Sequence, residues 1–277
     1  MKNFLSLSIV LALLAGLADS AAPITKEKAW TETYAVGTTA PHLEVSNIWG
    51  SVLVRTGPNG EITVAVSEIR TAPDEQRYSI SLDRINLDIE ATSNGVSIVV
   101  GDREHRWQRM DRCHGCRVDY QFEILVPPNA VIDVGTVMDG RVDVRGVEGV
   151  VSASNVNGPI SVDGIQNCGS INSVNGGVKI GFSRTPFRDC SIETINGDIT
   201  IKVPANTSLD LTVDLFNGDV KSEFPVDSFV LPATTEYVVE DGRHQYRIQQ
   251  LSGFRIGAGG PTYTIASMNG DVRIRKN

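Results

Sequence analysis

Cys113 and Cys116, with a histidine and a glycine between them, have the residue types and spacing for chemistry at sulfur. Such a pair can form a redox-active dithiol, or it can bind a metal with help from His105 and His114. A redox dithiol ordinarily opens a helix of a thioredoxin-like domain, and haem attachment would need a histidine where Arg117 stands. We therefore expect a short structural disulfide, with a metal site as the first alternative and redox activity as the second.

Cys168 and Cys190 complete an even set of four cysteines. They precede the asparagines of two successive Asn-Gly pairs, Asn175 and Asn196, by seven and six residues. If those two segments lie side by side in a sheet, the cysteines come within about 5 Å, the separation that a disulfide needs. We therefore expect a Cys168–Cys190 disulfide, which also indicates an oxidising compartment.

The charged segment 102–117 carries five residues that could bind a ligand, almost without apolar neighbours. The arginines could bind an anionic glycan or a partner protein, and the tryptophan could stack on a sugar ring. The alternative is a solvated loop whose arginines are balanced by its own acidic residues. The candidate ligand residues are Arg103, Arg106, Trp107, Arg109 and Arg112.

No catalytic constellation is found in the sequence. The motifs Gly-x-Ser-x-Gly and His-Glu-x-x-His are absent, and the four histidines follow no spacing rule. We predict no enzyme, no cofactor and no metal site. The alternative is a polysaccharide lyase or hydrolase that uses paired carboxylates from distant segments.

The elements that must carry these residues are strands of a repeat. Its pattern is apolar, Asn, Gly, any, apolar, any, apolar, with Asn replaced in two copies and the last apolar residue in one. The glycines at 140, 158, 176, 197 and 218 are 18, 18, 21 and 21 residues apart, an interval that suits one coil of a solenoid. The copies occupy residues 48–54, 138–144, 156–162, 174–180, 195–201, 216–222 and 268–274.

Two all-β folds can accommodate this repeat. Asn-Gly is typical of two-residue hairpin turns, which would give an antiparallel hairpin meander. Pro159 follows one Asn-Gly pair and cannot donate the ladder hydrogen bond that a hairpin would require there. We therefore favour a single-stack β-solenoid with Asn-Gly repeats of about 18–21 residues.

Each of the five copies that contain Asn has a further apolar residue four positions before it, namely Ala153, Ile171, Ile192, Val213 and Ile265. Strict alternation breaks between it and the next apolar residue, so we expect a corner or bulge near each Asn-Gly pair. Asp198, Asp219 and Asp271 follow three of the pairs and should stack along one edge. Turn chemistry explains them, whereas a calcium ladder would need a different glycine-rich repeat.

The rest of the chain also reads as strands. Apolar residues alternate over 61–70, 85–90, 96–100 and 118–126, and no segment keeps a 3.6-residue period, so helix content should be low. Residues 225–262 interrupt the repeat. We expect a signal peptide at 1–22, an irregular β region at 23–130, and a repeat region at 131–277 that continues it.

Composition and charge narrow the functions. The net charge of −8 disfavours nucleic acid and anionic membrane surfaces as partners. Residues 1–22 combine Lys2, a short apolar stretch and small residues near 20–22, as in a secretory signal peptide. No later segment is long and apolar enough to cross a membrane. We expect a periplasmic or secreted protein.

The succession of Asn-Gly repeats after a strand that ends in Val126-Pro127 resembles a large bacterial family of exported β-strand-repeat proteins labelled "putative adhesin". The matching parts lie within residues 43–277. The resemblance implies a β-solenoid-like fold, an envelope location and an attachment role, and it transfers no site residues. We expect a non-catalytic structural or attachment module of the cell envelope, with a glycan-binding protein as the alternative. The partner would be an envelope glycan or protein, and exposed end strands would allow self-association.

Overall fold

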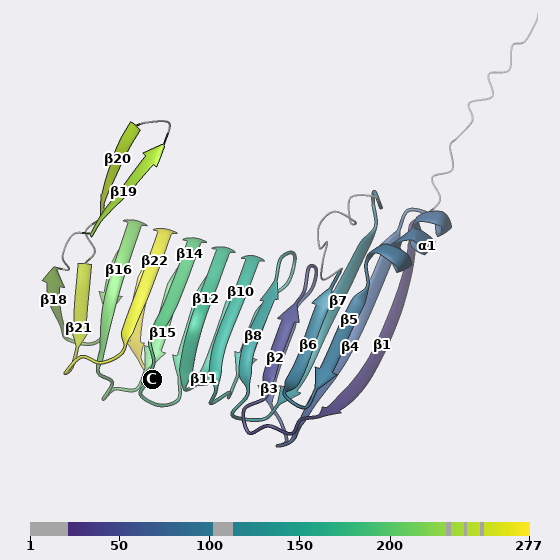
Figure 1. The fold of residues 1–277 in the computed structure, drawn as a ribbon, viewed down its shortest axis with the longest axis horizontal. Coiled ribbons are helices and arrows are strands. Elements are labelled where there is room, and N and C mark those ends of the chain that lie inside the picture. Colours follow the sequence, from purple (N-terminus) through teal and green to yellow (C-terminus); the bar gives the residue numbers. More distant parts are fainter. Residues whose placement is uncertain (1–21, 102–112, 231–233, 241–242, 250–251) are drawn as a thin grey trace, which may run out of the picture.

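The computed structural model of the chain describes residues 22–101, 113–230, 234–240, 243–249 and 252–277. The fold is all-β, as predicted, with two large sheets facing each other and one short helix (Figure 1). Sheet 1 has, in spatial order, β1 (Ile24–Ala35), β4 (Glu61–Ala72), β7 (Arg117–Val126), β3 (Val52–Thr56), β9 (Val142–Arg145), β11 (Ile160–Ile165), β13 (Val178–Phe182), β15 (Ile199–Val203), β23 (Val272–Lys276) and β17 (Val220–Ser222).

Sheet 2 lies opposite sheet 1 and completes the sandwich. Its strands are, in spatial order, β18 (Val226–Val230), β21 (Ser252–Ile256), β16 (Leu209–Asn217), β22 (Thr262–Asn269), β14 (Cys190–Asn196), β12 (Asn167–Asn175), β10 (Val150–Asn157), β8 (Val131–Thr136), β2 (His42–Ser46), β6 (Gly95–Val100) and β5 (Leu87–Thr92). The remaining elements are α1 (Glu75–Arg84) and the hairpin of β19 (Thr234–Glu240) and β20 (Arg243–Gln249).

The repeats form the regular part of both sheets. Each Asn-Gly pair joins a strand of sheet 2 to a strand of sheet 1, and we call such a pair of strands with its corner a coil, for example β10–β11. Equivalent residues of neighbouring coils pair in parallel, so that Asn157 lies beside Asn175 and Asn175 beside Asn196. A hairpin meander would pair them antiparallel, and that alternative is therefore wrong for the repeats.

The glycines of the corners are stacked so closely that no side chain fits between them. A Cβ added at Gly176 would lie 2.0 Å from the carbonyl oxygen of Gly158, and one at Gly158 would lie 2.0 Å from that of Gly140. The same holds at Gly197, whose Cβ would lie 2.3 Å from the Gly176 oxygen. Glycine is required at this position by the close approach of the backbones. The paired asparagines keep negative φ, so the corner is not a type I′ turn.

The break in alternation occurs at the corners, which is the first of the two expected causes. The strand of sheet 2 continues to alternate, but its last inward-facing residue is polar. Thr136 and Asn155 are buried there and donate to the carbonyls of Gly50 and Gly140, at 2.8 and 3.0 Å. Polar side chains are needed at this buried position because the corner carbonyls require donors.

The apolar residue just before each Asn therefore points outward. Phe216, Met268 and Ile195 are 80%, 53% and 43% exposed. The core is instead formed by the apolar residues four positions before the Asn, such as Ile171 and Ile192 in sheet 2, and two positions after the Gly, such as Val178 in sheet 1. All three are fully buried.

The last coil of the chain does not lie at the end of the stack. Strands β22 and β23 lie between the coil β14–β15 and the coil β16–β17, which precedes them in sequence (Figure 1). Tyr263, Ile265 and Val272 of this inserted coil are fully buried. Asp198, Asp219 and Asp271 do stack, but in the order 198, 271, 219, because the inserted coil separates the other two.

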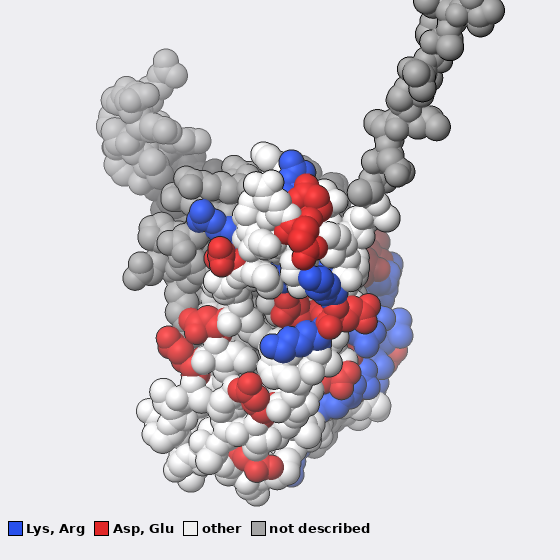
Figure 2. Space-filling view, turned by 90° about the vertical axis from the view of Figure 1, so that its right-hand side faces the viewer, with Lys and Arg blue, Asp and Glu red and all other residues white. Residues whose placement is uncertain are grey.

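The N-terminal end of the stack is closed by elements that the sequence did not predict. Strand β1 pairs antiparallel with β4, and α1 lies between the ends of the two sheets. The buried side chain of Arg70 holds α1 in place, donating to the carbonyl of Ile85 at 3.0 Å and to the hydroxyl of Tyr120 at 3.2 Å, and pairing with Glu68. The surface of this end carries acidic and basic side chains interspersed among uncharged ones (Figure 2).

Substituting Gly176→Ala tests the close stacking of the corners. Its Cβ would meet the Gly158 oxygen at 2.0 Å, so we expect a loss of roughly 3 kcal/mol in the free energy of unfolding. The neighbouring Gly177→Ala is the control, because its Cβ would meet nothing nearer than the Asp198 oxygen at 3.5 Å, an ordinary contact. Urea denaturation of both variants would measure the difference, and equal losses would refute the tight stack.

Candidate functional site

The outer face of sheet 1 carries a cationic groove, although the chain as a whole is acidic. The groove has a volume of about 510 Å³, within the range of roughly 300–1,000 Å³ that is typical of ligand clefts. The chain has a net charge of −8, yet five cationic side chains and a single carboxylate line the groove. The charged lining residues are Arg145, Lys179, Lys202, Arg273, Arg275 and Asp163.

The in-register stack places these side chains in rows. In each coil the residues between the buried apolar positions of sheet 1 point outward, since side chains alternate along a strand. Lys179 pairs with Thr200, and Thr200 with Arg273, which gives one row across three strands. Lys202 lies beside Arg275 in the second row. Neighbouring strands are about 4.8 Å apart, so the charges have a fixed spacing.

The floor of the groove is hollow because Gly181 occupies an outward position of the second row. A Cβ at Gly181 would lie 2.1 Å from the Oδ1 atom of Asp163, so the carboxylate of Asp163 lies over the glycine. Ser161 and Thr200 add hydroxyl groups to the same lining. The groove therefore offers both cations and neutral hydrogen-bonding groups.

The cations of the groove fall into two groups. Arg145 is held by Asp143 at 2.7 Å, and Arg273 by Asp198 at 2.6 Å. Within the described part of the chain, no carboxylate lies within ion-pair distance of Lys179, Lys202 or Arg275, all of which are exposed. The paired arginines are fixed in position, and the other three cations are free to bind an anion.

The stacked aspartates next to the groove are satisfied by the protein itself. Hydrogen bonding to Arg273 lowers the pKa of Asp198 below its ordinary value, and Lys221 does the same for Asp271. Each carboxylate also accepts from the backbone N–H of the next aspartate, at 2.9 and 3.1 Å. These contacts run between neighbouring coils and not within one turn. Among the described residues no group of three His, Cys, Asp or Glu side chains could hold a metal ion.

A second cleft, of about 1120 Å³, lies at the N-terminal end of the stack. Its aromatic rings are already covered by lysines: the Nζ atom of Lys26 is 4.1 Å from the ring centre of Tyr78, and that of Lys28 is 4.6 Å from Trp30. Inward-facing charges on an end strand protect it from pairing with other chains. We therefore interpret this cleft as part of the cap that closes the N-terminal end of the stack.

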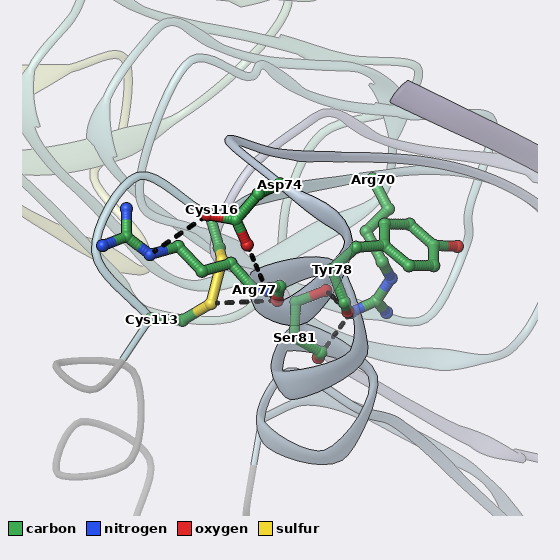
Figure 3. The surroundings of a disulfide bond; sticks show 7 residues. All are labelled: Arg70, Asp74, Arg77, Tyr78, Ser81, Cys113 and Cys116. Atoms are coloured by element: carbon green, nitrogen blue, oxygen red, sulfur yellow. Dashed lines mark hydrogen bonds and ion pairs between the residues drawn. A yellow bond between two sulfur atoms is a disulfide. The ribbon is translucent and has the colours of Figure 1, made fainter. Parts of the chain in front are cut away.

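The disulfide between Cys113 and Cys116 is present in the structure and lies against α1 (Figure 3). Both sulfur atoms contact the carbonyl oxygen of Arg77, at 3.4 and 3.5 Å. Asp74 caps the helix by accepting from the N–H of Arg77 at 2.7 Å. The disulfide thus closes a short loop before β7 and packs it against the helix that closes the stack.

The disulfide between Cys168 and Cys190 is also present, and it joins the neighbouring strands β12 and β14 with a Cα–Cα distance of 5.4 Å. The candidate ligand residues Arg103, Arg106, Trp107, Arg109 and Arg112 lie outside the described residues, as does His105. The signal peptide expected at 1–22 also falls almost wholly outside them. No described helix is long and apolar enough to span a membrane.

The sequence did not single out the free cations Lys179, Lys202 and Arg275. Each of them is an ordinary polar residue of its own strand, so the sequence of one strand does not mark it as a ligand residue. The basic pattern is visible only when the copies are aligned, because basic residues then lie at outward positions of coils that are neighbours in space.

Solved structures of bacterial proteins resemble the chain over most of its length. A putative cell adhesion protein from Clostridium sporogenes is 10% identical, with 90% of this chain and 100% of that chain covered and a TM-score of 0.42. Putative adhesins from Bacteroides fragilis and Parabacteroides distasonis are 11% and 13% identical, with TM-scores of 0.26 and 0.25. For both of them, 90% of this chain and 97% of that chain are covered. No family model and no curated protein matches the chain. At these identities no ligand or site residue is transferred.

Removing the Cys168–Cys190 disulfide by a double alanine substitution should lower the free energy of unfolding by roughly 3 kcal/mol, because the bond closes a loop with a sequence separation of 22. The matched control replaces Cys113 and Cys116, with a separation of 3, and should cost less. Denaturant titration would compare the two variants. A larger loss for the 113–116 pair would contradict the chain-entropy argument.

The aspartate row predicts an acid limit of stability. Because the folded pKa values of Asp198 and Asp271 lie below the unfolded value of about 3.9, their contribution is present above that pH and is lost as the pH falls through the folded values. In Arg273→Gln this contribution should be smaller, so the variant should be less stable than the wild type at pH 7, and the difference should narrow as the pH falls below the unfolded value. Urea midpoints measured from pH 7 to pH 3 test this, and superimposable profiles would refute it.

Proposed function

We propose that the protein is a non-catalytic attachment module of the cell envelope, built as a single-stack β-solenoid, which binds acidic polysaccharide in the groove of sheet 1. The observation that carries the proposal is the set of three unpaired cations at fixed spacing on the exposed face of an acidic chain. A repeating anionic polymer matches rows of charge that recur from coil to coil.

The solenoid architecture is supported by the parallel, in-register pairing of successive repeats in both sheets. An envelope or extracellular location is supported by the two disulfides and by the signal-peptide pattern of the first 22 residues. In such a compartment, polysaccharides that carry carboxylate, phosphate or sulfate groups are the abundant polyanions.

The chemistry of the groove favours binding without catalysis. Hydrolysis of a glycosidic bond ordinarily uses two carboxyl groups on either side of the bond. Asp163 is the single carboxylate among the described residues that line the groove. Its role in the proposal is to orient neighbouring cations and sugar hydroxyls.

Binding to alginate, a carboxylated polysaccharide, tests the proposal, with dextran sulfate as a sulfated polymer and dextran as the uncharged one. We expect binding to the acidic polymers that weakens as salt is added, because exposed charges are screened. Neutralising the free cations together (Lys179→Gln, Lys202→Gln, Arg275→Gln) should weaken binding about tenfold, since each exposed ionic contact contributes about 0.2–1 kcal/mol.

The matched control removes the same number of charges at the N-terminal end (Lys26→Gln, Lys28→Gln, Arg77→Gln) and should leave binding unchanged. Equal weakening by the two triple variants would mean that net charge, and not the groove, governs binding. Equal affinity for dextran would refute recognition of acidic groups.

A further inference from the structure

The asparagines of the repeat form a ladder along the stack. In each rung the Nδ2 atom of one asparagine donates to the Oδ1 atom of the asparagine in the neighbouring coil. Four such bonds of 2.9–3.0 Å connect Asn157, Asn175, Asn196, Asn269 and Asn217, in this spatial order. Every asparagine except the last therefore has its Oδ1 atom engaged by the next coil.

The glycine that follows each asparagine is engaged in the same direction. The N–H groups of Gly158, Gly176, Gly197 and Gly270 donate to the asparagine carbonyl of the next coil, at 2.9–3.0 Å. In these four rungs both groups that could react with each other, the glycine N–H and the asparagine side-chain amide, are hydrogen-bonded to the neighbouring coil.

The last rung differs because none of the described coils follows it. Strand β17 is the edge of sheet 1, and on that side the described pairing of β16 with β21 extends from Leu209 to Val213. Within the described residues, nothing accepts from the N–H of Gly218 and nothing donates to the Oδ1 atom of Asn217. Asn217 and Gly218 are both exposed, and the preceding Phe216 is 80% exposed.

We infer that Asn217 is a site of spontaneous deamidation, and that it is the reactive member of the Asn-Gly ladder. The backbone nitrogen of Gly218 attacks the Cγ atom of Asn217; the new C–N bond closes a succinimide, and ammonia leaves with the side-chain nitrogen. Water then opens the ring at either carbonyl, giving aspartate or a β-aspartyl linkage. Glycine favours ring closure because it has no side chain to hinder the attack.

The internal rungs are protected because the attack requires local opening of the coil. The glycine N–H must leave its acceptor and the side-chain amide must leave its ladder partner. One net hydrogen bond is of the order of 1.4 kcal/mol, which corresponds to a factor of ten in rate. We expect Asn217 to react at least about tenfold faster than any other asparagine of the ladder.

The consequence is a defined weak point at the end of the stack. The product places a carboxylate next to Asp219 and the row of stacked aspartates. A β-aspartyl linkage also adds a backbone carbon where β16 turns into β17, which shifts the register against β23. The last coil should loosen first, and the inserted coil β22–β23 would then become the edge.

Peptide mapping by mass spectrometry of the full mature chain tests the inference after incubation at 37 °C and mildly alkaline pH. We expect conversion at Asn217, and at Asn59, whose Asn-Gly pair lies in an exposed turn and serves as the positive control. The other four asparagines of the ladder should remain intact. In denaturant after reduction, all five should react at similar rates, which separates protection by the fold from effects of local sequence.

The identity of the reactive residue also reports the order of the coils. If the coils were stacked in the order of the chain, Asn269 would be the last rung and would react in place of Asn217. Fastest conversion at Asn269, equal rates at all five positions in the native protein, or an intact Asn217 beside a converted Asn59 would each overturn the inference.

Discussion

The structure depends on how closely the backbones approach at the glycine of each corner. The carbonyl oxygen of one glycine occupies the place where a Cβ of the next would lie, about 2 Å away, from Gly140 to Gly218. This contact fixes the register of neighbouring coils, because a shift by one residue would bring a side chain into the column. Once the register is fixed, the asparagine ladder, the buried donors of the corner carbonyls and the outward rows follow from the alternation of the strands.

The same register turns a modest sequence signal into a surface with a fixed charge pattern. Lys179, Lys202 and Arg275 come from three different repeats and lie far apart in the chain, yet they line one groove. Insertion of the C-terminal coil is essential here, because it brings Arg273 and Arg275 next to β15. A stack in chain order would place Lys221 there instead, and the groove would lose two arginines.

Much of the architecture could be predicted from the sequence, because the repeat has a strong local pattern. The parallel in-register strands, the neighbourhood of Cys168 and Cys190, and the stacking of the aspartates all follow from aligning the copies. The order of the coils could not be predicted, since every copy carries the same corner and any two copies fit side by side. Helix α1 was missed because its apolar period is short and its position depends on the buried Arg70, and β1 was missed because its inward-facing residues are charged or aromatic.

The surface was the least predictable part. The apolar residue before each Asn lies outside the core: Phe216 and Met268 face solvent because a polar residue must face the corner carbonyls. The arginine-rich segment 102–112 lies outside the described residues. The cationic groove is lined by residues of several coils, which are brought together only in the folded chain. Local patterns identify strands, whereas a site assembled from several coils requires their order in space.

Hydrogen exchange of the glycine amides, measured by NMR on the native protein, tests the central claim most directly. We expect slow exchange at Gly158, Gly176, Gly197 and Gly270, whose N–H groups donate to the next coil, and fast exchange at Gly218. Fast exchange at Gly270 with protection at Gly218 would mean that the coils stack in chain order. Fast exchange at all five would contradict the stacked corners themselves.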